Sequence, residues 1–433
     1  MRSAPLRLVR ALLGGCLFVV LATGLLAGCQ KPGDLPDATP RAPADVPVLL
    51  LSIDGLRHDY LELHAAPTLD SLRNASASVE RFVPSFPTKT FPNHYTLVTG
   101  LHPGNHGIVA NNMYDPAMDA SFSLGNTEAV TNGAWWDDAE PIWVTAEQQG
   151  LRAATYFWPG SEAEIDGTRP SYWTAYDGSV PGHERVDTVL EWLDLPAAER
   201  PSFLTLYFST VDTQGHRHGP ASPEVAAALR TVDGYVQRLL DGLAARDQQV
   251  HLFITGDHGM ASTSPDRAVV LDRHIDLRDV QRVDYTPVGM MNPKPGVDPQ
   301  PIIDTLDALP RVSAYHRSET PETLHFRNHP RIPEIIAIAD AGWSLTTTSY
   351  LNTNPDALQG ATHGYVPSAP EMHTLLIANG PAFAAGTRVD TLDFVDLYPL
   401  MTHLLALDPA SNDGSLDAAR RLLRPDAAVA PAP

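Results

Sequence analysis

Cysteine is nearly absent from this sequence. The chain has 433 residues and 2 cysteines, Cys16 and Cys29, which both lie close to the N-terminus. The rest of the chain can therefore form neither a disulfide nor a thiolate metal site. Any metal site there must use nitrogen and oxygen ligands, and sites of that kind tend to be open and catalytic rather than structural.

Basic residues are also scarce. The sequence has 30 Lys and Arg against 51 Asp and Glu, and its formal net charge is −21. A broad nucleic-acid-binding surface is excluded, because it needs a basic face. An acidic protein can still act on small phosphate esters, because bound metal ions then dominate the local charge.

The N-terminus has the pattern of a targeting segment. Arginines precede an apolar run over residues 11–27, which ends in the small residues before Cys29. This pattern predicts a bacterial lipoprotein signal peptide over residues 1–28, with Cys29 as the lipid-bearing first residue of the mature chain. A short transmembrane anchor is the alternative. Residues 29–45 are rich in Pro, Asp and Ala and predict a flexible tether, so we expect an exported protein, periplasmic or attached to an outer membrane.

Three apolar runs end in side chains that can bind metals. VPVLLLSI leads to Asp54, FLTLYFSTV leads to Asp212, and HLFIT leads to Asp257 and His258. Near-continuous apolar runs of this length are typical of buried parallel strands. Open α/β sheets build their sites where such strands end, so we expect these side chains at one edge of a sheet.

The combination of residues points to a metal site more strongly than any member does. A single Asp at a strand end is usually a turn former or a helix cap, and a single His is usually a surface or core residue. Asp212 and His216 are four residues apart, so one helical turn can present both to one ion. His363, in ATHGY, adds a further ligand type. Asp and His together suit Zn²⁺.

Thr90 lies where a helix should begin. The preceding segment is rich in Pro, and Phe91 to Val98 follows with helical character. The dipole and free amides of a helix N-terminus favour an anion such as phosphate. Thr90 alone would be interpreted as a cap, but beside the predicted ligands it is a candidate nucleophile activated by a metal.

The chain resembles the nucleotide pyrophosphatase/phosphodiesterase family of the alkaline phosphatase superfamily. The resemblance runs from about Val46 to about Leu407 and is carried by long, specific strings: LLLSIDGLR, FPTKTFPNHYTLVTGLHPGNHGIVANNMYDP, FWPGSEAEIDG, VDTQGHRHGP, TGDHGM and THGY. It implies an α/β fold like that of alkaline phosphatase, with a mostly parallel central sheet flanked by helices. The long interval between His258 and His363 indicates a small α+β cap subdomain over about residues 285–345, inside a catalytic domain over residues 46–410. Residues 411–433 are assigned to a C-terminal tail.

The resemblance also implies the roles of individual residues. It places one Zn²⁺ on Asp54, Thr90, Asp257 and His258, and a second on Asp212, His216 and His363. Asn111 matches an asparagine that donates to a phosphate oxygen. Phe91 and Tyr176 match aromatic residues that stack on a nucleobase, and Leu124 matches an apolar contact in the same pocket. Without the resemblance, Asn111 would be interpreted as a turn residue and the other three as core residues.

The implied reaction is hydrolysis of nucleotide phosphodiester and pyrophosphate bonds, with release of nucleoside 5′-monophosphates. Thr90 would attack phosphorus, a phosphothreonine would form, and a second displacement would release it with net retention. The alternatives are a phospholipid or choline-phosphate diesterase, a phosphonoacetate hydrolase or monoesterase of the same superfamily, and a non-enzymatic zinc-binding lipoprotein. Lys89 is the one basic residue beside Thr90 in the motif, and the sequence does not show where it points.

Overall fold

The computed structural model describes residues 44–425, apart from the side chains of residues 282 and 283. Its largest element is an eight-stranded sheet. The strands follow one another across the sheet in this order: β18 (Arg388–Asp393), β2 (Ala77–Val83), β17 (Thr374–Asn379), β8 (His251–Thr255), β1 (Val48–Ile53), β7 (Phe203–Phe208), β5 (Ala153–Tyr156) and β6 (Tyr172–Thr174). All pairings are parallel except the two that β17 makes, so the predicted α/β class with a mostly parallel sheet is confirmed.

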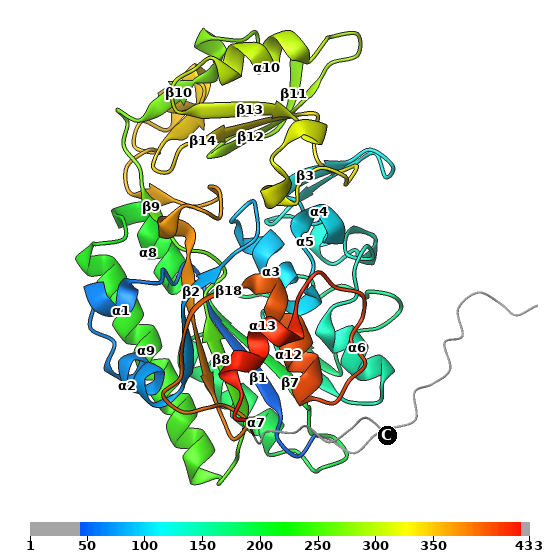
Figure 1. The fold of residues 1–433 in the computed structure, drawn as a ribbon, viewed down its shortest axis with the longest axis vertical. Coiled ribbons are helices and arrows are strands. Elements are labelled where there is room, and N and C mark those ends of the chain that lie inside the picture. The colour runs from blue at the N-terminus through cyan, green and yellow to red at the C-terminus, as the bar shows by residue number, and fades with distance from the viewer. Residues whose placement is uncertain (1–43, 426–433) are drawn as a thin grey trace, which may run out of the picture. The chain divides into compact units, whose positions relative to one another are not determined.

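Helices cover both faces of this sheet (Figure 1). Successive side chains of a strand point to opposite faces, and β1 is buried on both. Leu49 and Leu51 pack in a core with α2 (Pro67–Ala75), α7 (Gly182–Leu193) and α9 (Pro223–Ala245). Val48 and Leu50 pack in a second core with α3 (Thr90–Thr99), α6 (Ile142–Gln148) and α12 (Leu397–Leu404). The run VLLLSI is apolar throughout because neither of its faces meets water.

A second sheet lies in the long interval between His258 and His363 (Figure 1). It is four-stranded and antiparallel, in the order β11 (Val280–Asp284), β12 (Val288–Pro293), β14 (Ile335–Ala339) and β13 (Val312–His316). Helix α10 (Gln300–Asp307) packs in one core with Met291 and Ile335. Met290 and Ile336 belong instead to the large core around α3. The insertion is therefore packed onto the main domain on one side and covered by its own helix on the other.

Smaller elements complete the described chain. The short strand pairs are β3 (Asn112–Asp115) with β4 (Ala120–Ser123), β9 (Ala261–Ser262) with β16 (Ala361–Thr362), and β10 (Ala268–Val270) with β15 (Ser344–Thr346). The remaining α-helices are α1 (Tyr60–Leu63), α4 (Pro103–His106), α5 (Thr127–Val130), α8 (Thr210–His218), α11 (Thr348–Thr353) and α13 (Leu416–Ala419). Within residues 44–425, no helix combines the length and the apolar character that crossing a membrane requires.

The two ends of the chain differ in how much of them the structure describes. The predicted signal peptide over residues 1–28, the lipid attachment at Cys29 and the predicted tether as far as residue 43 lie outside the described residues. At the other end, residues 411–425 differ from a free tail. Ala419 and Leu422 are fully buried in the large core, and the Asp413 amide donates to the Gly100 carbonyl oxygen. This part of the predicted tail is thus packed against the helix that begins at Thr90.

Candidate active site

The predicted ligands come together at one edge of the central sheet. Strands β8, β1 and β7 are parallel neighbours, so their carboxyl ends face the same way. Asp54 directly follows β1, and Asp257 and His258 follow β8 after one glycine. Asp212 lies in the first turn of α8, which follows β7. Its backbone amide donates to the Asp54 carbonyl oxygen at 3.0 Å, which ties the start of α8 to the end of β1.

The ligand types form two groups, each compact enough to surround one ion. Asp54, Asp257 and His258 make the first group, and Asp212, His216 and His363 make the second. Within each group one ligand atom per residue lies within 4.8 Å of the others. The rings of His258 and His363 stack with their centroids 3.4 Å apart, so the two groups are immediate neighbours. The two groups contain the Asp and His members of the two ligand sets that the resemblance implies, and Thr90 is considered below.

The three histidines all present the same ring nitrogen to the site. Their Nδ1 atoms contact backbone carbonyl oxygens: His216 with Ala361 at 3.0 Å, His258 with Gly259 at 2.9 Å, and His363 with Thr88 at 2.8 Å. A carbonyl oxygen only accepts, so Nδ1 must carry the proton and donate. The Nε2 lone pair is then left facing the carboxylates. Such anchoring of the outer nitrogen is typical of histidines that bind metals.

Several carboxylate oxygens of the two groups lack a hydrogen-bond donor. Among the residues that the structure describes, Asp54 Oδ1, Asp212 Oδ1 and Asp257 Oδ2 are buried without a hydrogen-bond donor. Asp257 Oδ2 lies 3.0 Å from His258 Nε2, so two lone pairs face each other unless a proton or a cation lies between them. Buried polar atoms normally have partners, so three orphaned oxygens in one place need an explanation. A divalent cation in each group would satisfy these oxygens, and the nitrogen and oxygen donor set fits zinc.

The pKa values of these groups reflect the same crowding. Burial raises the pKa of Asp54 well above its usual range, and repulsion from Asp257 and Asp212 raises it further. Burial also raises the pKa of Asp257, but His258 and His94 outweigh this effect and lower it to about 2. Burial lowers the pKa of His363, and the neighbouring His258 lowers it more. Opposing charges are therefore concentrated in a region that water hardly reaches.

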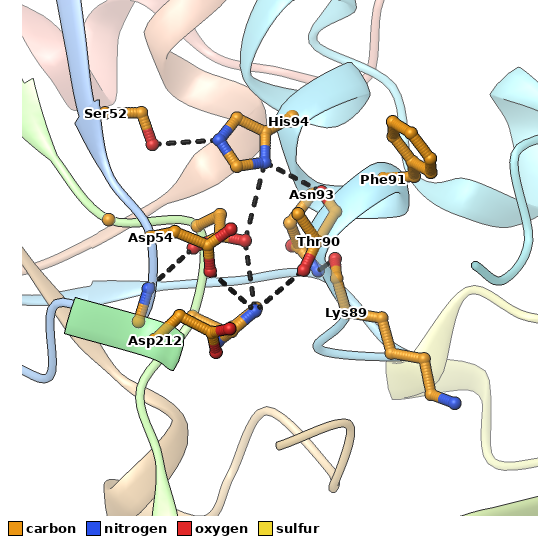
Figure 2. Close-up of polar contacts among 12 residues, drawn as sticks. Ser52, Asp54, Lys89, Thr90, Phe91, Asn93, His94 and Asp212 are labelled. Carbon is orange, nitrogen blue, oxygen red and sulfur yellow. Dashed lines mark hydrogen bonds and ion pairs between the residues drawn. The ribbon is translucent and has the colours of Figure 1, made fainter. Parts of the chain in front are cut away.

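Thr90 lies beside the first group at the start of α3. Its Oγ1 is 3.3 Å from His258 Nε2. Figure 2 shows Asp54, Thr90 and Asp212 around a common space, with Lys89 directed away from it. Lys89 Nζ instead forms an ion pair with Asp284 of β11. In the first turn of this helix, the Phe91 amide donates to the Asn111 side-chain oxygen, Pro92 has no N–H, and the Asn93 amide donates to the Lys89 carbonyl oxygen.

The loop before Thr90 is held by buried side chains of its own region. Asn93 is fully buried, accepts a hydrogen bond from the Ser85 amide and donates to the carbonyl oxygens of Ser85, Pro87 and Lys89. Thr88 accepts from the Gly364 amide and donates to the Tyr365 carbonyl oxygen, so the same loop is tied to the segment that carries His363. The position of Thr90 relative to the second ligand group is thereby defined.

One cavity of about 500 Å³ joins this site to a surface of aromatic residues. Asp257 and His258 are fully buried behind it. The other predicted site residues line it: Asp54, Thr90, Phe91, Asn111, Leu124, Tyr176, Asp212, His216 and His363. The Asn111 side-chain oxygen accepts from the Phe91 amide at 3.0 Å, so its NH₂ group is the end that can donate to a bound anion.

The aromatic and apolar lining is exposed rather than packed away. Leu124 is 49% exposed and Tyr176 is 52% exposed, which argues against a role in core packing for either. Phe91 lies on the same cavity and contacts Phe122 and Trp136 edge-to-face at its back. Half-exposed rings on a cavity wall are suited to stacking against a flat ligand.

Three residues of the site were not predicted from the sequence. The Tyr207 hydroxyl donates to Asp54 Oδ2 at 2.6 Å. His94 Nδ1 lies 3.4 Å from Asp257 Oδ2, and its Nε2 is 2.9 Å from Ser52 Oγ (Figure 2). Glu162 lines the cavity and accepts from the Tyr176 amide at 3.0 Å. His94 and Glu162 lie inside strings that carry the resemblance, and that was the only available signal for them.

The comparisons with known proteins agree with this geometry. A family model described as Type I phosphodiesterase / nucleotide pyrophosphatase matches residues 48–366. The chain is 40% identical over 405 residues to ectonucleotide pyrophosphatase/phosphodiesterase family member 1 of Mus musculus, covering 89% of this chain but 44% of that protein. It is 37% identical over 391 residues to an uncharacterized pyrophosphatase/phosphodiesterase of Schizosaccharomyces pombe, covering 87% of this chain and 80% of that protein. The chain thus spans less than half the length of the mouse protein.

The fold is also similar to solved structures. Murine ectonucleotide pyrophosphatase/phosphodiesterase 5, in an inactive threonine-to-alanine form in complex with AMP, has a TM-score of 0.83 and 34% sequence identity. The match covers 88% of this chain and 100% of that chain. The human form of that protein also has a TM-score of 0.83.

Proposed function

Because the chain belongs to the Type I phosphodiesterase / nucleotide pyrophosphatase family, we propose that it hydrolyses phosphodiester and pyrophosphate bonds of nucleotides and releases nucleoside 5′-monophosphates. The observation that carries the proposal is the shared cavity. It brings a threonine hydroxyl, two groups of metal-ligand types and an aromatic surface within reach of one small molecule. A site of that kind can hold a phosphate and a base at once.

The two ligand groups would hold two Zn²⁺ ions. Asp54, Asp257 and His258 would bind one ion together with Thr90 Oγ1, and Asp212, His216 and His363 would bind the other. The support is the set of orphaned carboxylate oxygens and the three outward-anchored histidines. Bound zinc supplies Lewis-acid stabilisation of charge on the phosphoryl oxygens.

Residues of the chain would supply the nucleophile, stabilise charge on the phosphate and bind the base. Thr90 gives its hydroxyl proton to solvent, and its Oγ1 forms a bond to phosphorus as the bond to the leaving oxygen breaks; the leaving group departs as an anion. The Asn111 NH₂ group donates to a non-bridging oxygen as charge develops there. Water then attacks the phosphothreonine from the opposite side and frees Thr90. Phe91, Leu124 and Tyr176 hold the base, which fixes the phosphate in line with the threonine.

The nucleotide assignment has support of its own. The similar murine structure contains AMP, a nucleoside 5′-monophosphate. In this chain Tyr176 and Phe91 offer π faces on the walls of the cavity, and bases of any identity can stack on such faces. We therefore expect broad acceptance of bases.

A substrate panel tests the proposal. The p-nitrophenyl ester of thymidine 5′-monophosphate should be the best substrate, ahead of p-nitrophenyl phosphate, phosphonoacetate and p-nitrophenyl phosphorylcholine. A preference for the choline ester would establish the lipid-type alternative. A preference for the monoester or phosphonoacetate would establish the other superfamily activities, and no turnover of any of the four with zinc would contradict an enzymatic role.

A further inference from the structure

Arg331 is a buried arginine of the insertion, and its side chain donates hydrogen bonds to residues of the main domain. It lies between β13 and β14 and is 4% exposed. Its Nε donates to Asp115 Oδ2 at 2.7 Å, and its two terminal nitrogens donate to three carbonyl oxygens: Trp135 at 2.7 Å, Gly107 at 3.1 Å and Ala134 at 3.1 Å. One terminal nitrogen also forms an ion pair with Asp138 Oδ2 at 3.3 Å. Its guanidinium also lies over the Trp135 ring, 5.0 Å from the centroid.

The hydrogen-bond partners of Arg331 all lie in one segment, residues 107–135, which is called the excursion below. Gly107 lies at its beginning, Asp115 lies in its hairpin, and Ala134 and Trp135 lie at its end. Between these points the excursion supplies one wall of the cavity: Asn111, Leu124, Gly125, Thr127 and Val130. Arg331 thus holds together three points of the segment that builds this wall, without lining the cavity itself.

The hairpin β3–β4 connects the arginine to the wall. At one end, the Leu124 amide donates to the Asn111 carbonyl oxygen at 3.0 Å. At the other end, Asp115 pairs with Ala120, and its Oδ1 accepts from the turn amides of residues 117 and 118. Arg331 donates to the other carboxylate oxygen of Asp115. Arg331 therefore fixes the end of the hairpin that contains Asp115. The opposite end carries Asn111 and Leu124, the predicted contacts to phosphate and base.

The end of the excursion is fixed in the same way. The Trp135 ring packs against Phe122 of β4, with centroids 5.3 Å apart. The next residue, Trp136, donates from its ring nitrogen to the carbonyl oxygen of Val130, which lines the cavity. Trp136 also contacts Phe91 edge-to-face. A displacement at Trp135 would therefore be transmitted to the back of the base-binding surface.

We propose that Arg331 is a positioning residue that sets the geometry of the base-binding wall, and that through it the insertion determines the preference for esters that carry a base. This rests on the proposed nucleotide function. Only arginine suits the position, because its planar fork can reach a carboxylate and several carbonyl oxygens at once. Lysine keeps the charge but has a single nitrogen, so it would leave buried acceptors unpaired.

The test compares Arg331→Lys with a matched control, Arg327→Lys. Arg327 lies in the same segment and also binds a carbonyl oxygen and a carboxylate, but its partners, Thr320 and Glu322, are local. Kinetics are measured with the p-nitrophenyl ester of thymidine 5′-monophosphate and with methyl p-nitrophenyl phosphate, which lacks a base. For Arg331→Lys we expect KM for the nucleotide ester to rise about ten- to a hundredfold, the scale of a misplaced binding surface, while KM for the methyl ester stays within about twofold. Arg327→Lys should leave the ratio of the two KM values unchanged.

A double-mutant comparison identifies the wall through which Arg331 acts. Leu124 lies on the excursion and Tyr176 lies outside it. The effects of Arg331→Lys and Leu124→Ala on KM should be less than additive, whereas those of Arg331→Lys and Tyr176→Ala should be nearly additive. Asp115→Asn, which keeps Arg331 and one acceptor oxygen, should give a smaller base-selective rise.

The outcomes are distinct. Equal losses of Arg331→Lys on both substrates, or no loss on either, would overturn the proposal. So would the loss of cooperative unfolding in both Arg331→Lys and Asp115→Asn, since the arginine would then support the whole domain rather than one wall. A wild-type enzyme that fails to turn over the nucleotide ester but hydrolyses another diester would instead overturn the proposed function.

Discussion

The direction of Lys89 bears on the kind of phosphate ester that the site can accept. Lys89 directly precedes Thr90, but its side chain is buried, pairs with Asp284 and lies 3.3 Å from the Thr286 carbonyl oxygen. Within the part of the chain that the structure describes, the cavity lining has no Lys or Arg. A phosphate monoester carries one more negative charge than a diester and would find no side-chain cation here in addition to the proposed zinc ions. This arrangement favours diesters.

Tyr176→Ala tests the base contact at the same scale. Tyr176 is half-exposed on the cavity wall, and a base–aromatic stack is worth about 1–3 kcal/mol. KM for nucleotide diesters should therefore rise by about one to two decades. Methyl p-nitrophenyl phosphate, which has no base, serves as the control and should keep its KM. An equal rise for both esters would assign Tyr176 to packing.

At the residue scale, the predictable side chains are those whose type and position form a pattern. Asp54, Asp212 and Asp257 each follow an apolar run, so their chemistry and their place were both predictable. Tyr207 was not, because β7 is buried on both faces and its letters do not show which face meets the site. Its contact with Asp54 depends on the register of β7 against β1, in which Tyr207 lies opposite Ser52.

At the scale of elements, the start of α3 is the feature that determines the site. The helix begins at Thr90, as the motif predicts, and the loop over residues 84–89 leads into it. The apolar runs of β1, β7 and β8 predicted the strands because fully buried strands need no polar face. The reversed direction of β17 was not predictable, because it follows from pairing with strands that are distant in the sequence.

Asn93→Ala should loosen the loop that carries Thr90. The substitution leaves the Ser85 amide and the Ser85 carbonyl oxygen without their side-chain partner in a fully buried place, while the carbonyl oxygens of Pro87 and Lys89 keep only backbone donors. We expect the free energy of unfolding to fall by about 2–4 kcal/mol, because buried groups without partners are costly. The kcat should fall for nucleotide and methyl esters alike, because Thr90 is shared. Urea unfolding and steady-state kinetics measure the two effects. Unchanged kcat with reduced stability would show that the loop does not depend on Asn93.

His106 should make the stability of the α3–α4 region depend on pH. Burial lowers the pKa of His106 to about 3. Its Nδ1 accepts from the Ile108 amide, and its Nε2 lies 3.1 Å from the Pro92 carbonyl oxygen, so the neutral ring satisfies both contacts. In the unfolded chain the ring binds a proton below about pH 6.5. The unfolded state then binds more protons, and stability falls as the pH decreases from 6.5 toward 3.

The measurement is urea unfolding of wild type and His106→Gln between pH 7 and pH 4. The wild-type free energy of unfolding should fall more steeply, by about 1.4 kcal/mol per pH unit for this one group. The metal site lies in both proteins, so its own pH dependence cancels in the comparison. Parallel curves would mean that His106 can be protonated in the folded state.

At the scale of the whole molecule, the insertion contributes polar side chains that contact the main domain near the site. Its Asp284 pairs with Lys89 and its Arg331 pairs with Asp115, in the segment that builds one wall of the cavity, so two of its side chains contact the main domain. The sequence predicted an insertion from the long interval before His363, but not these contacts. They are single polar side chains that meet partners about two hundred residues away, and no local pattern marks them.

Removal of metal should affect both activity and stability. Without cations, the orphaned oxygens of Asp54, Asp212 and Asp257 remain unpaired and repel one another. Treatment with a chelator should stop turnover and lower the midpoint of thermal unfolding by about 5–10 °C, and zinc should restore both. Asp54→Ala serves as the control, since its unfolding should respond less to the chelator. Full activity of chelator-treated protein with less than one metal ion per chain would contradict a two-metal site.

The stereochemical course at phosphorus tests the central claim most directly. The claim is that Thr90 Oγ1 takes the phosphoryl group before water does, as its place beside His258 and at the start of α3 indicates. The measurement is hydrolysis, in isotopically labelled water, of a nucleotide phosphorothioate diester of known configuration. Two in-line displacements predict net retention of configuration in the released nucleoside phosphorothioate. Net inversion would show that water attacks the substrate directly and that Thr90 is not the nucleophile.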